Sequence, residues 1–131
     1  MIFVDTSFWV AASLQRDPRR DTAAALLRAK ADESLVTSNH VRGETWTFLR
    51  RRAGHPAAVD FLDRIHRSPR MKVVFVGEDL ERQALRWLRG HDEREFSFVD
   101  ATSFALMRSL RIRDALAFDG DFSAAGFVEL R

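Results

Sequence analysis

Three carboxylates in this sequence stand where apolar runs end or a helix begins. Asp5 directly follows the apolar run 2–4, and Asp119 follows a second apolar run, 115–118. Asp100 lies in the first turn of a predicted helix. Because ligands of open α/β folds gather at the ends of strands, we expect these acids to converge only in the folded chain. Converging carboxylates repel one another in a partly desolvated cleft, and one or two divalent cations relieve that repulsion.

A site built from carboxylates alone favours hard cations that keep some of their waters, which indicates Mg²⁺ or Mn²⁺. Such a centre binds a phosphate oxygen, lowers the pKa of a bound water and stabilises charge during in-line displacement at phosphorus. Water is then the nucleophile, and the acids act as ligands more than as proton-transfer groups. The residue types therefore predict phosphodiester hydrolysis.

Two further acids are candidates for the same site. Glu44 lies on a predicted helix, one turn from both Val41 and Phe48. Its carboxylate is therefore expected at the edge of the core-facing stripe and not on the solvent face. Asp121 shares a turn with Asp119, separated from it by a glycine.

All of these acids except Asp5 also have a purely structural explanation. Glu44 can extend from the rim of a buried face. Asp100 fits a capping box, in which it and the helix-capping serine three residues earlier each accept a backbone N–H of the other. Asp119 and Asp121 are ordinary turn formers beside glycine. Asp5 is the hardest to explain in this way, since a carboxylate after a fully apolar strand is poorly placed to be a surface charge.

The composition fits one folded domain over residues 1–131. With 46% hydrophobic residues and 11 Phe, the chain can bury a substantial core. No apolar run approaches the ~20 residues of a membrane span, and the first residues lack the pattern of a signal peptide, so we expect a soluble, cytoplasmic protein without a membrane partner. The chain has no Cys, which excludes disulfides, thiolate catalysis and thiolate metal sites.

The positive charge is modest but strongly biased toward arginine. The formal net charge is +2, and the pI of about 9.9 overstates the basicity because the chain has no Tyr or Cys to titrate. Only Lys30 and Lys72 are lysines, and guanidinium groups suit bidentate phosphate contacts. Arg51 shares roughly the helix face of Glu44, where it can contact phosphates; the alternative is a solvated helix end.

Short apolar runs alternate with helical segments along the chain. We expect strands at 2–4, 34–38, 72–76, 115–118 and 127–130, and helices at 8–14, 22–31, 39–52, 57–67, 78–89 and 98–110. This alternation predicts an α/β fold in which a central parallel sheet of four to five strands carries helices on both faces.

Two other folds share part of this pattern. The strand followed by Asp119 and Asp121 resembles a haloacid dehalogenase-type phosphatase, but too little chain remains for the later motifs of that fold. A receiver-like signalling domain also gathers acids at strand ends. It requires a phosphoacceptor Asp after a middle strand, where Gly77 stands, and a Lys where Asp119 stands.

Taken together and in order, four stretches resemble the acidic motifs of PIN-domain ribonucleases. They are Val4–Ser7, Ser38–Trp46, Phe96–Ala101 and Ala117–Phe122. More narrowly, the chain resembles the VapC toxins of bacterial type II toxin–antitoxin pairs over nearly its whole length. The resemblance implies a PIN-like three-layer α/β/α fold.

The resemblance also implies roles for residues and partners. By position, Asp5, Glu44, Asp100 and Asp119 are the catalytic acids and bind the metal, with Asp121 as a further metal ligand. The implied activity is that of a Mg²⁺- or Mn²⁺-dependent endoribonuclease toxin that cuts structured RNA, a tRNA or an rRNA loop, and so inhibits translation. The expected partners are this RNA, a cognate VapB-type antitoxin and a second copy of the chain in a homodimer. The alternative is a non-catalytic PIN-like module that binds RNA or protein.

Trp46 is the candidate for an exposed anchor in the antitoxin or dimer contact. It lies away from the core-facing stripe of its predicted helix. Trp is also frequent among the residues that dominate binding energies at interfaces.

Overall fold

The computed structural model describes residues 1–131 and contains a five-stranded sheet. The strands are β1 Ile2–Val4, β2 Leu35–Ser38, β3 Met71–Val74, β4 Asp114–Leu116 and β5 Val128–Leu130. They lie in the order β3-β2-β1-β4-β5, and every neighbouring pair is parallel. The predicted α/β fold with four to five parallel strands is confirmed.

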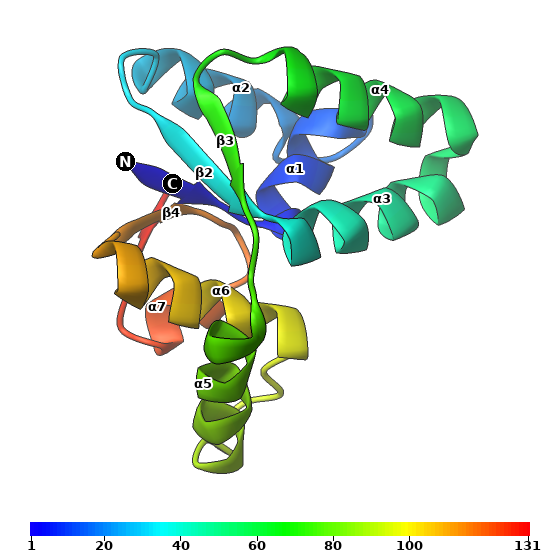
Figure 1. Cartoon of the computed structure of the whole chain (residues 1–131). Coiled ribbons are helices and arrows are strands. Elements are labelled where there is room, and N and C mark those ends of the chain that lie inside the picture. The colour runs from blue at the N-terminus through cyan, green and yellow to red at the C-terminus, as the bar shows by residue number, and fades with distance from the viewer.

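The connections between the strands supply the helices. These are α1 Thr6–Ser13, α2 Arg20–Ala29, α3 Asn39–Ala53, α4 His55–Arg67, α5 Glu78–Arg89, α6 Phe98–Leu110 and α7 Asp121–Ala124. Helices α1 to α4 cover one face of the sheet and α5 to α7 lie on the other, so the fold has three layers (Figure 1). The short α7 was not predicted from the sequence. None of the helices combines the length and apolar character that a membrane crossing requires.

The central strand β1 is apolar throughout because both of its faces are buried. On the α6 side of the sheet, Phe3 packs against Phe122 with ring centroids 5.9 Å apart, and Phe104 meets Phe122 at 5.0 Å. All three rings are fully buried, and burial of each contributes roughly 2 kcal/mol. This aromatic cluster joins β1, α6 and α7, the elements that contain or directly adjoin Asp5, Asp100 and Asp121.

The strand order reverses between β1 and β4. The chain runs from β1 through β2 to β3, and then crosses back to place β4 on the other side of β1. The carboxyl ends of β1 and β4 therefore border the crevice at which open α/β sheets bind ligands. At this end Val4 is in register with Leu116, and the Asp5 N–H donates to the Leu116 carbonyl at 3.0 Å.

Helix α6 is held against the sheet and against α5. Every residue from 100 to 107 is buried. The small side chains of Ala101 and Ala105 let α5 approach closely. Thr102 donates its hydroxyl to the Val99 carbonyl at 2.8 Å, so this buried polar group is satisfied within the helix. The first turn of α6 is thereby fixed beside the crevice.

Trp46 of α3 corrects one prediction. Its side chain is half-buried and packs against the core, and its ring meets the His55 ring edge-on at 5.8 Å. The expectation of an exposed anchor was wrong, because α4 folds back along this side of α3 and covers it.

Candidate metal centre

Asp5 ends the central strand and caps α1. The residue is 2% exposed, and its Oδ2 accepts the backbone N–H and the hydroxyl of Ser7 at 3.1 and 2.8 Å. An N-cap residue keeps an extended backbone while its side chain satisfies a free N–H of the first turn, which lets β1 pass into α1 without a loop. The carboxylate is therefore buried at the strand end with only neutral hydrogen-bond partners.

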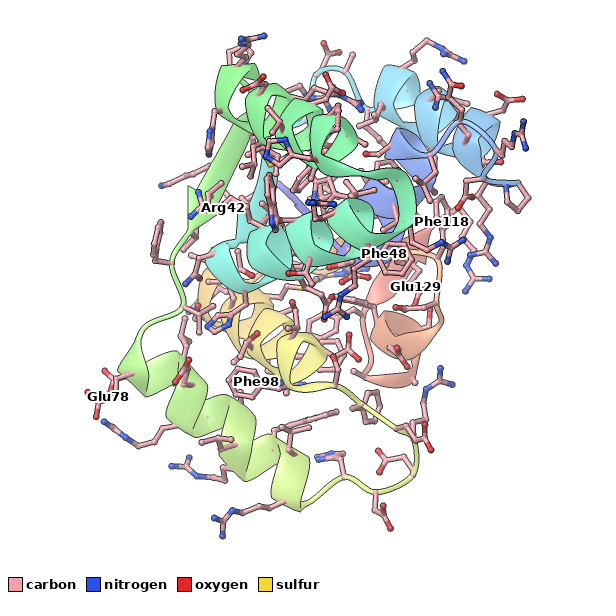
Figure 2. The ribbon with its side chains drawn as sticks, turned by 90° about the vertical axis from the view of Figure 1, so that its right-hand side faces the viewer. Arg42, Phe48, Glu78, Phe98, Phe118 and Glu129 are labelled. Carbon is pink, nitrogen blue, oxygen red and sulfur yellow. The ribbon has the colours of Figure 1, made fainter.

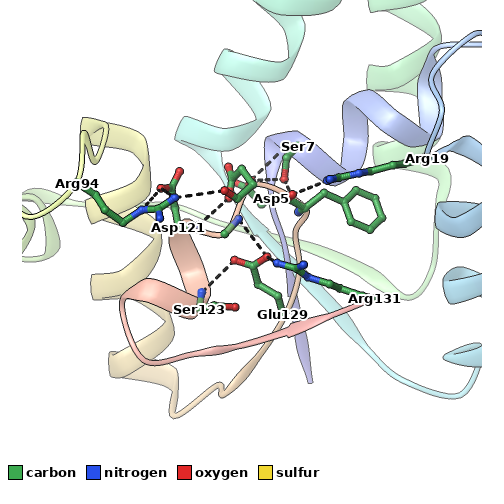
Figure 3. A network of polar contacts seen from close by, with 11 residues as sticks. Asp5, Ser7, Arg19, Arg94, Asp121, Ser123, Glu129 and Arg131 are labelled. Carbon is green, nitrogen blue, oxygen red and sulfur yellow. Dashed lines mark hydrogen bonds and ion pairs between the residues drawn. The ribbon is translucent and has the colours of Figure 1, made fainter.

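Ser7 connects Asp5 to the segment after β4. Its hydroxyl donates to Asp5 and accepts the N–H of Phe118 at 2.9 Å (Figure 3). Because Phe118 directly precedes Asp119, this bridge fixes the two acids relative to each other. From the sequence, Ser7 is either a helix cap or a residue that holds water or a phosphate oxygen, and its contact with Phe118 is found only in the fold.

Asp100 is held by a capping box at the start of α6. Its side chain accepts the N–H of Ser97 at 3.0 Å, and its own N–H donates to the Ser97 hydroxyl at 2.9 Å. Burial raises the pKa of Asp100 to about 6, and the carboxylates of Asp121 and Asp119 contribute to the rise. The structural explanation for Asp100 is therefore correct, and the same residue also lies among other acids.

The turn after β4 is supported by Glu129 of β5. The Glu129 side chain is only 1% exposed, and its carboxylate accepts the N–H groups of Gly120 and Ser123 at 3.2 and 3.0 Å (Figure 3). Gly120 has a φ of +84°, a left-handed conformation that any side chain would strain. This sharp turn brings Asp119 and Asp121 toward the same point.

Asp100, Asp119 and Asp121 converge in the fold. One carboxylate oxygen of each lies within 4.8 Å of the corresponding oxygens of the other two. Partial desolvation raises the pKa of Asp119, and the carboxylates of Asp121 and Glu129 raise it further. These three side chains form the acidic cluster.

Asp5 lies close enough to the acidic cluster to be affected by its charge. Burial raises the pKa of Asp5 to about 7, and the carboxylates of Asp119 and, more weakly, Asp100 add to the rise. The hydrogen bonds from Ser7 act in the opposite direction but do not cancel this. Near neutral pH Asp5 is therefore close to half-protonated, and a positive ion beside it would ionise it.

Arg94 is the cation that reaches the acidic cluster. It belongs to the segment between α5 and α6, and its Nε and a terminal nitrogen lie 3.0 and 2.9 Å from the Asp121 Oδ1 (Figure 3). The terminal nitrogen also donates to the Asp119 carbonyl at 3.4 Å. Asp5, Asp100 and the Asp119 carboxylate form no ion pair with any Arg, Lys or His.

Glu44 stands apart from the acidic cluster. It is exposed and lines a groove of about 720 Å³ with Val99, the residue before Asp100. Its predicted position away from the solvent face was wrong, because the buried stripe of α3 is only one residue wide and consists of Val41, Thr45 and Leu49. Helix α3 lies beside α6 on this side of the molecule (Figure 2).

The residues present fit a hard divalent cation. The donors are carboxylate oxygens and they converge from separate elements. Burial, and then the neighbouring carboxylates, raise the pKa values of Asp5, Asp100 and Asp119. Carboxylate oxygens are the preferred protein ligands of Mg²⁺ and Mn²⁺. Asp100, Asp119 and Asp121 would hold the ion, and the neighbouring Asp5 would contribute its charge.

Sequence reasoning did not identify Arg94 or Glu129. Arg94 contacts a residue 27 positions away, and its surroundings in the sequence are a mixed run of charges without a motif. Glu129 occupies a strand position that usually reads as solvent-facing. No pattern in the neighbouring sequence marks either residue, because both act by contacting the turn after β4, which the fold places beside them.

The fold is that of the PIN domain. The family model described as PIN domain matches residues 2–128, and the chain belongs to this family. A PIN domain is a nuclease domain, so the expected class of enzyme is confirmed at this level.

Within the family, the chain is similar to VapC proteins. It is 59% identical over 131 residues to the 23S rRNA-specific endonuclease VapC20 of Mycobacterium tuberculosis, from strain H37Rv and from strain CDC 1551 / Oshkosh, covering 100% of this chain and 98% of each relative. A crystal structure of VapC20 from the same species, described as a sarcin–ricin loop cleaving toxin, superposes with a TM-score of 0.94 at 57% identity over 100% of this chain and 99% of that chain. The predicted resemblance to VapC toxins is confirmed.

Proposed function

We propose that this chain is a Mg²⁺- or Mn²⁺-dependent endoribonuclease toxin that cuts the sarcin–ricin loop of 23S rRNA and so inhibits translation. The observation that carries the proposal is the convergence of Asp100, Asp119 and Asp121 above the buried Asp5, at the switch point of a PIN-domain sheet. The choice of ribosomal RNA over tRNA rests on the names of the relatives, which are 59% identical over the full chain.

A divalent cation at this centre supplies stabilisation for negative charge at phosphorus and a lowered pKa for the attacking water. The chain supplies the arrangement of its ligands. The capping box holds Asp100 in one orientation, and Ser7 ties Asp5 to the segment that carries Asp119. Ligands fixed by such partners need little rearrangement when charge develops during the reaction.

Arginines near the acids are suited to RNA phosphates. Arg51 and Arg52 line the groove that also contains Glu44. Arg19 donates to the Phe118 carbonyl beside Asp119 and lies over the Phe118 ring at 5.1 Å. An RNA strand that approaches the acids would meet this positive charge, which favours phosphate contacts without selecting a sequence.

The partners belong to the same proposal. A cognate VapB-type antitoxin would neutralise the nuclease, and exposed apolar side chains on the β3–α5–α6 side are available for a homodimer: Phe75, Leu85 and Phe98 are 66%, 48% and 38% exposed. We further propose that the single PIN domain acts in the cytoplasm, where its ribosomal substrate lies.

The experiment compares wild type with Asp100→Asn on an RNA hairpin carrying the sarcin–ricin loop. With Mg²⁺ or Mn²⁺ present, wild type should release one pair of fragments ending in a 5′-phosphate and a 3′-hydroxyl. Asp100→Asn should be slower by about a thousandfold or more, because several kcal/mol of charge stabilisation depend on the ligand. Circular dichroism should be unchanged, since Asn can still accept the Ser97 N–H in the capping box.

Two results would overturn the proposal. Cleavage by Asp100→Asn at a rate near that of wild type would remove the acidic cluster from the mechanism. Binding of the hairpin by wild type without any metal-dependent cleavage would favour the alternative of a non-catalytic RNA-binding module. Cleavage of a tRNA in preference to the hairpin would reject the substrate but keep the enzyme class.

A further inference from the structure

The acidic cluster has a counter-ion supplied by the chain itself. Arg94 lies in the segment 90–97, which contributes none of the proposed ligands. Its guanidinium nevertheless contacts the Asp119 carbonyl and the Asp121 carboxylate. It also lies beside Gly120, where an added Cβ would be 3.5 Å from a terminal nitrogen.

The ion pair with Asp121 occupies an oxygen that a metal would need. Two guanidinium nitrogens lie within 3.0 Å of the same atom, Asp121 Oδ1. The Asp121 side chain is 19% exposed and the Arg94 side chain 43%, so the pair is partly shielded from water and is stronger than a fully exposed one. A divalent cation that takes up this carboxylate must share it with Arg94 or displace the guanidinium.

The contact that Arg94 makes differs from that of Arg19, which lies beside the same turn. Arg19 donates to a backbone carbonyl and lies over an aromatic ring, and it touches no carboxylate. Its position satisfies a polar group of the fold. Arg94 instead neutralises one member of a set of acids whose mutual repulsion is otherwise uncompensated.

We propose that Arg94 is the internal counter-ion of the metal centre: it holds Asp121 while the divalent cation is absent and competes with that cation for the carboxylate. Arg94 thereby sets how tightly the centre binds metal and keeps the turn 119–121 in place before metal arrives. This inference rests on the metal centre proposed above. It does not depend on the RNA that is cut.

The test measures Mn²⁺ binding by isothermal titration calorimetry on metal-free protein, with no RNA present. Arg94→Gln should bind Mn²⁺ about tenfold more tightly than wild type, because a competing unit charge a few Å from the divalent ion is removed. Arg89→Gln is the matched control, since Arg89 precedes the same segment, is exposed and forms no ion pair, and its affinity should stay within about twofold of wild type.

Two further variants separate competition from a merely structural tether. Arg94→Lys keeps the charge and loses the planar fork, so its Mn²⁺ affinity should stay near that of wild type. In an Asp121→Asn background, Arg94→Gln should change the affinity by less than about threefold, because the contested carboxylate is gone. Thermal unfolding of each metal-free protein checks that the variants are folded.

The inference is overturned if Arg94→Gln binds Mn²⁺ as tightly as wild type or more weakly. It is also overturned if Arg94→Gln raises the Mn²⁺ affinity equally in the wild-type and the Asp121→Asn backgrounds. A lower melting temperature with unchanged affinity would mean that Arg94 is only a tether. If wild type binds no Mn²⁺ at all, the metal centre itself is wrong. If wild type binds Mn²⁺ but does not cut RNA, the proposed nuclease fails while the role of Arg94 is still decided by the affinities.

Discussion

The two ends of the parallel sheet contain charged groups that are compensated in different ways. At the amino ends of β2 and β3, Arg70 donates to the carbonyls of Leu27, Lys30 and Glu33, which lie at and just beyond the end of α2. At the carboxyl ends of β1 and β4, the carboxylates of the acidic cluster face one another.

This difference in compensation distinguishes Arg70, whose charge supports the fold, from the acidic cluster, which is suited to bind a cation. Carbonyls at the end of a helix are fixed partial charges that remain with Arg70 under all conditions, so this charge completes the fold. The acids have only Arg94 as a cationic partner, and the pKa values of Asp5, Asp100 and Asp119 are raised. The repulsion among these acids lowers the stability of the fold, and a cation from solution would relieve it.

The largest expected effect on stability comes from Asp5. Its pKa rises from 3.8 to about 7 on folding. Below pH 3.8 the carboxyl is protonated in both the folded and the unfolded chain, and it favours neither. Between pH 3.8 and about 7 the unfolded chain releases the proton while the folded chain keeps it, so the free energy of unfolding falls as the pH rises.

Asp5→Asn removes this penalty and should stabilise the metal-free protein by roughly 4 kcal/mol near pH 8, with the difference shrinking toward pH 4. Urea denaturation at several pH values measures it. Asp92→Asn, at an exposed acid that forms no ion pair, is the control and should show the same stability as wild type at each pH. If Asp5→Asn is less stable than wild type at every pH, the ionised Asp5 does not lower the free energy of unfolding, which would contradict this account.

Glu44 sharpens the comparison, because it lies beside the carboxyl end of the sheet but outside the acidic cluster. Glu44→Gln should lower the rate of RNA cleavage by roughly 10- to 100-fold, the range for residues that support a metal site from outside. Its Mn²⁺ affinity should change less than that of Asp100→Asn. If Glu44→Gln instead abolishes Mn²⁺ binding, Glu44 is a direct ligand and the groove closes onto the acids when metal binds.

The smallest effect is expected at the amino end. Arg70→Met should lower the free energy of unfolding by about 1 to 2 kcal/mol, because the helix carbonyls lose their donor. It should leave Mn²⁺ affinity unchanged. Arg64→Met is the matched control, since Arg64 is exposed near the same end and forms no ion pair, and its stability should change by less than about 0.5 kcal/mol.

Much of the acidic site could be predicted because local patterns position it. Asp5 follows an uninterrupted apolar strand, and Asp100 closes a capping box that the structure contains as predicted. Asp119 follows a late strand, although β4 ends at Leu116 and the acid lies three residues beyond. In each case the strand or helix end that carries the acid is visible in a few neighbouring residues.

The remaining features depend on contacts that no local pattern encodes. Arg94 reaches Asp121 across 27 residues, and Glu129 reaches Gly120 across 9. Glu44 is exposed because the buried stripe of α3 is narrow. The width of that stripe depends on how α4 and the sheet pack against α3, which the spacing of apolar residues does not show. Partners of this kind become apparent only when the whole sheet is assembled.

The central claim is that the acids at the switch point of the sheet bind a divalent cation. Crystals grown with Mn²⁺ and measured at the manganese absorption edge test it most directly, because the anomalous signal locates the ion itself. We predict a peak in contact with the carboxylates of Asp100 and Asp119, with Asp5 beneath it and Arg94 shifted from Asp121. An anomalous map with no peak at these carboxylates, in protein that cuts RNA, would contradict the account.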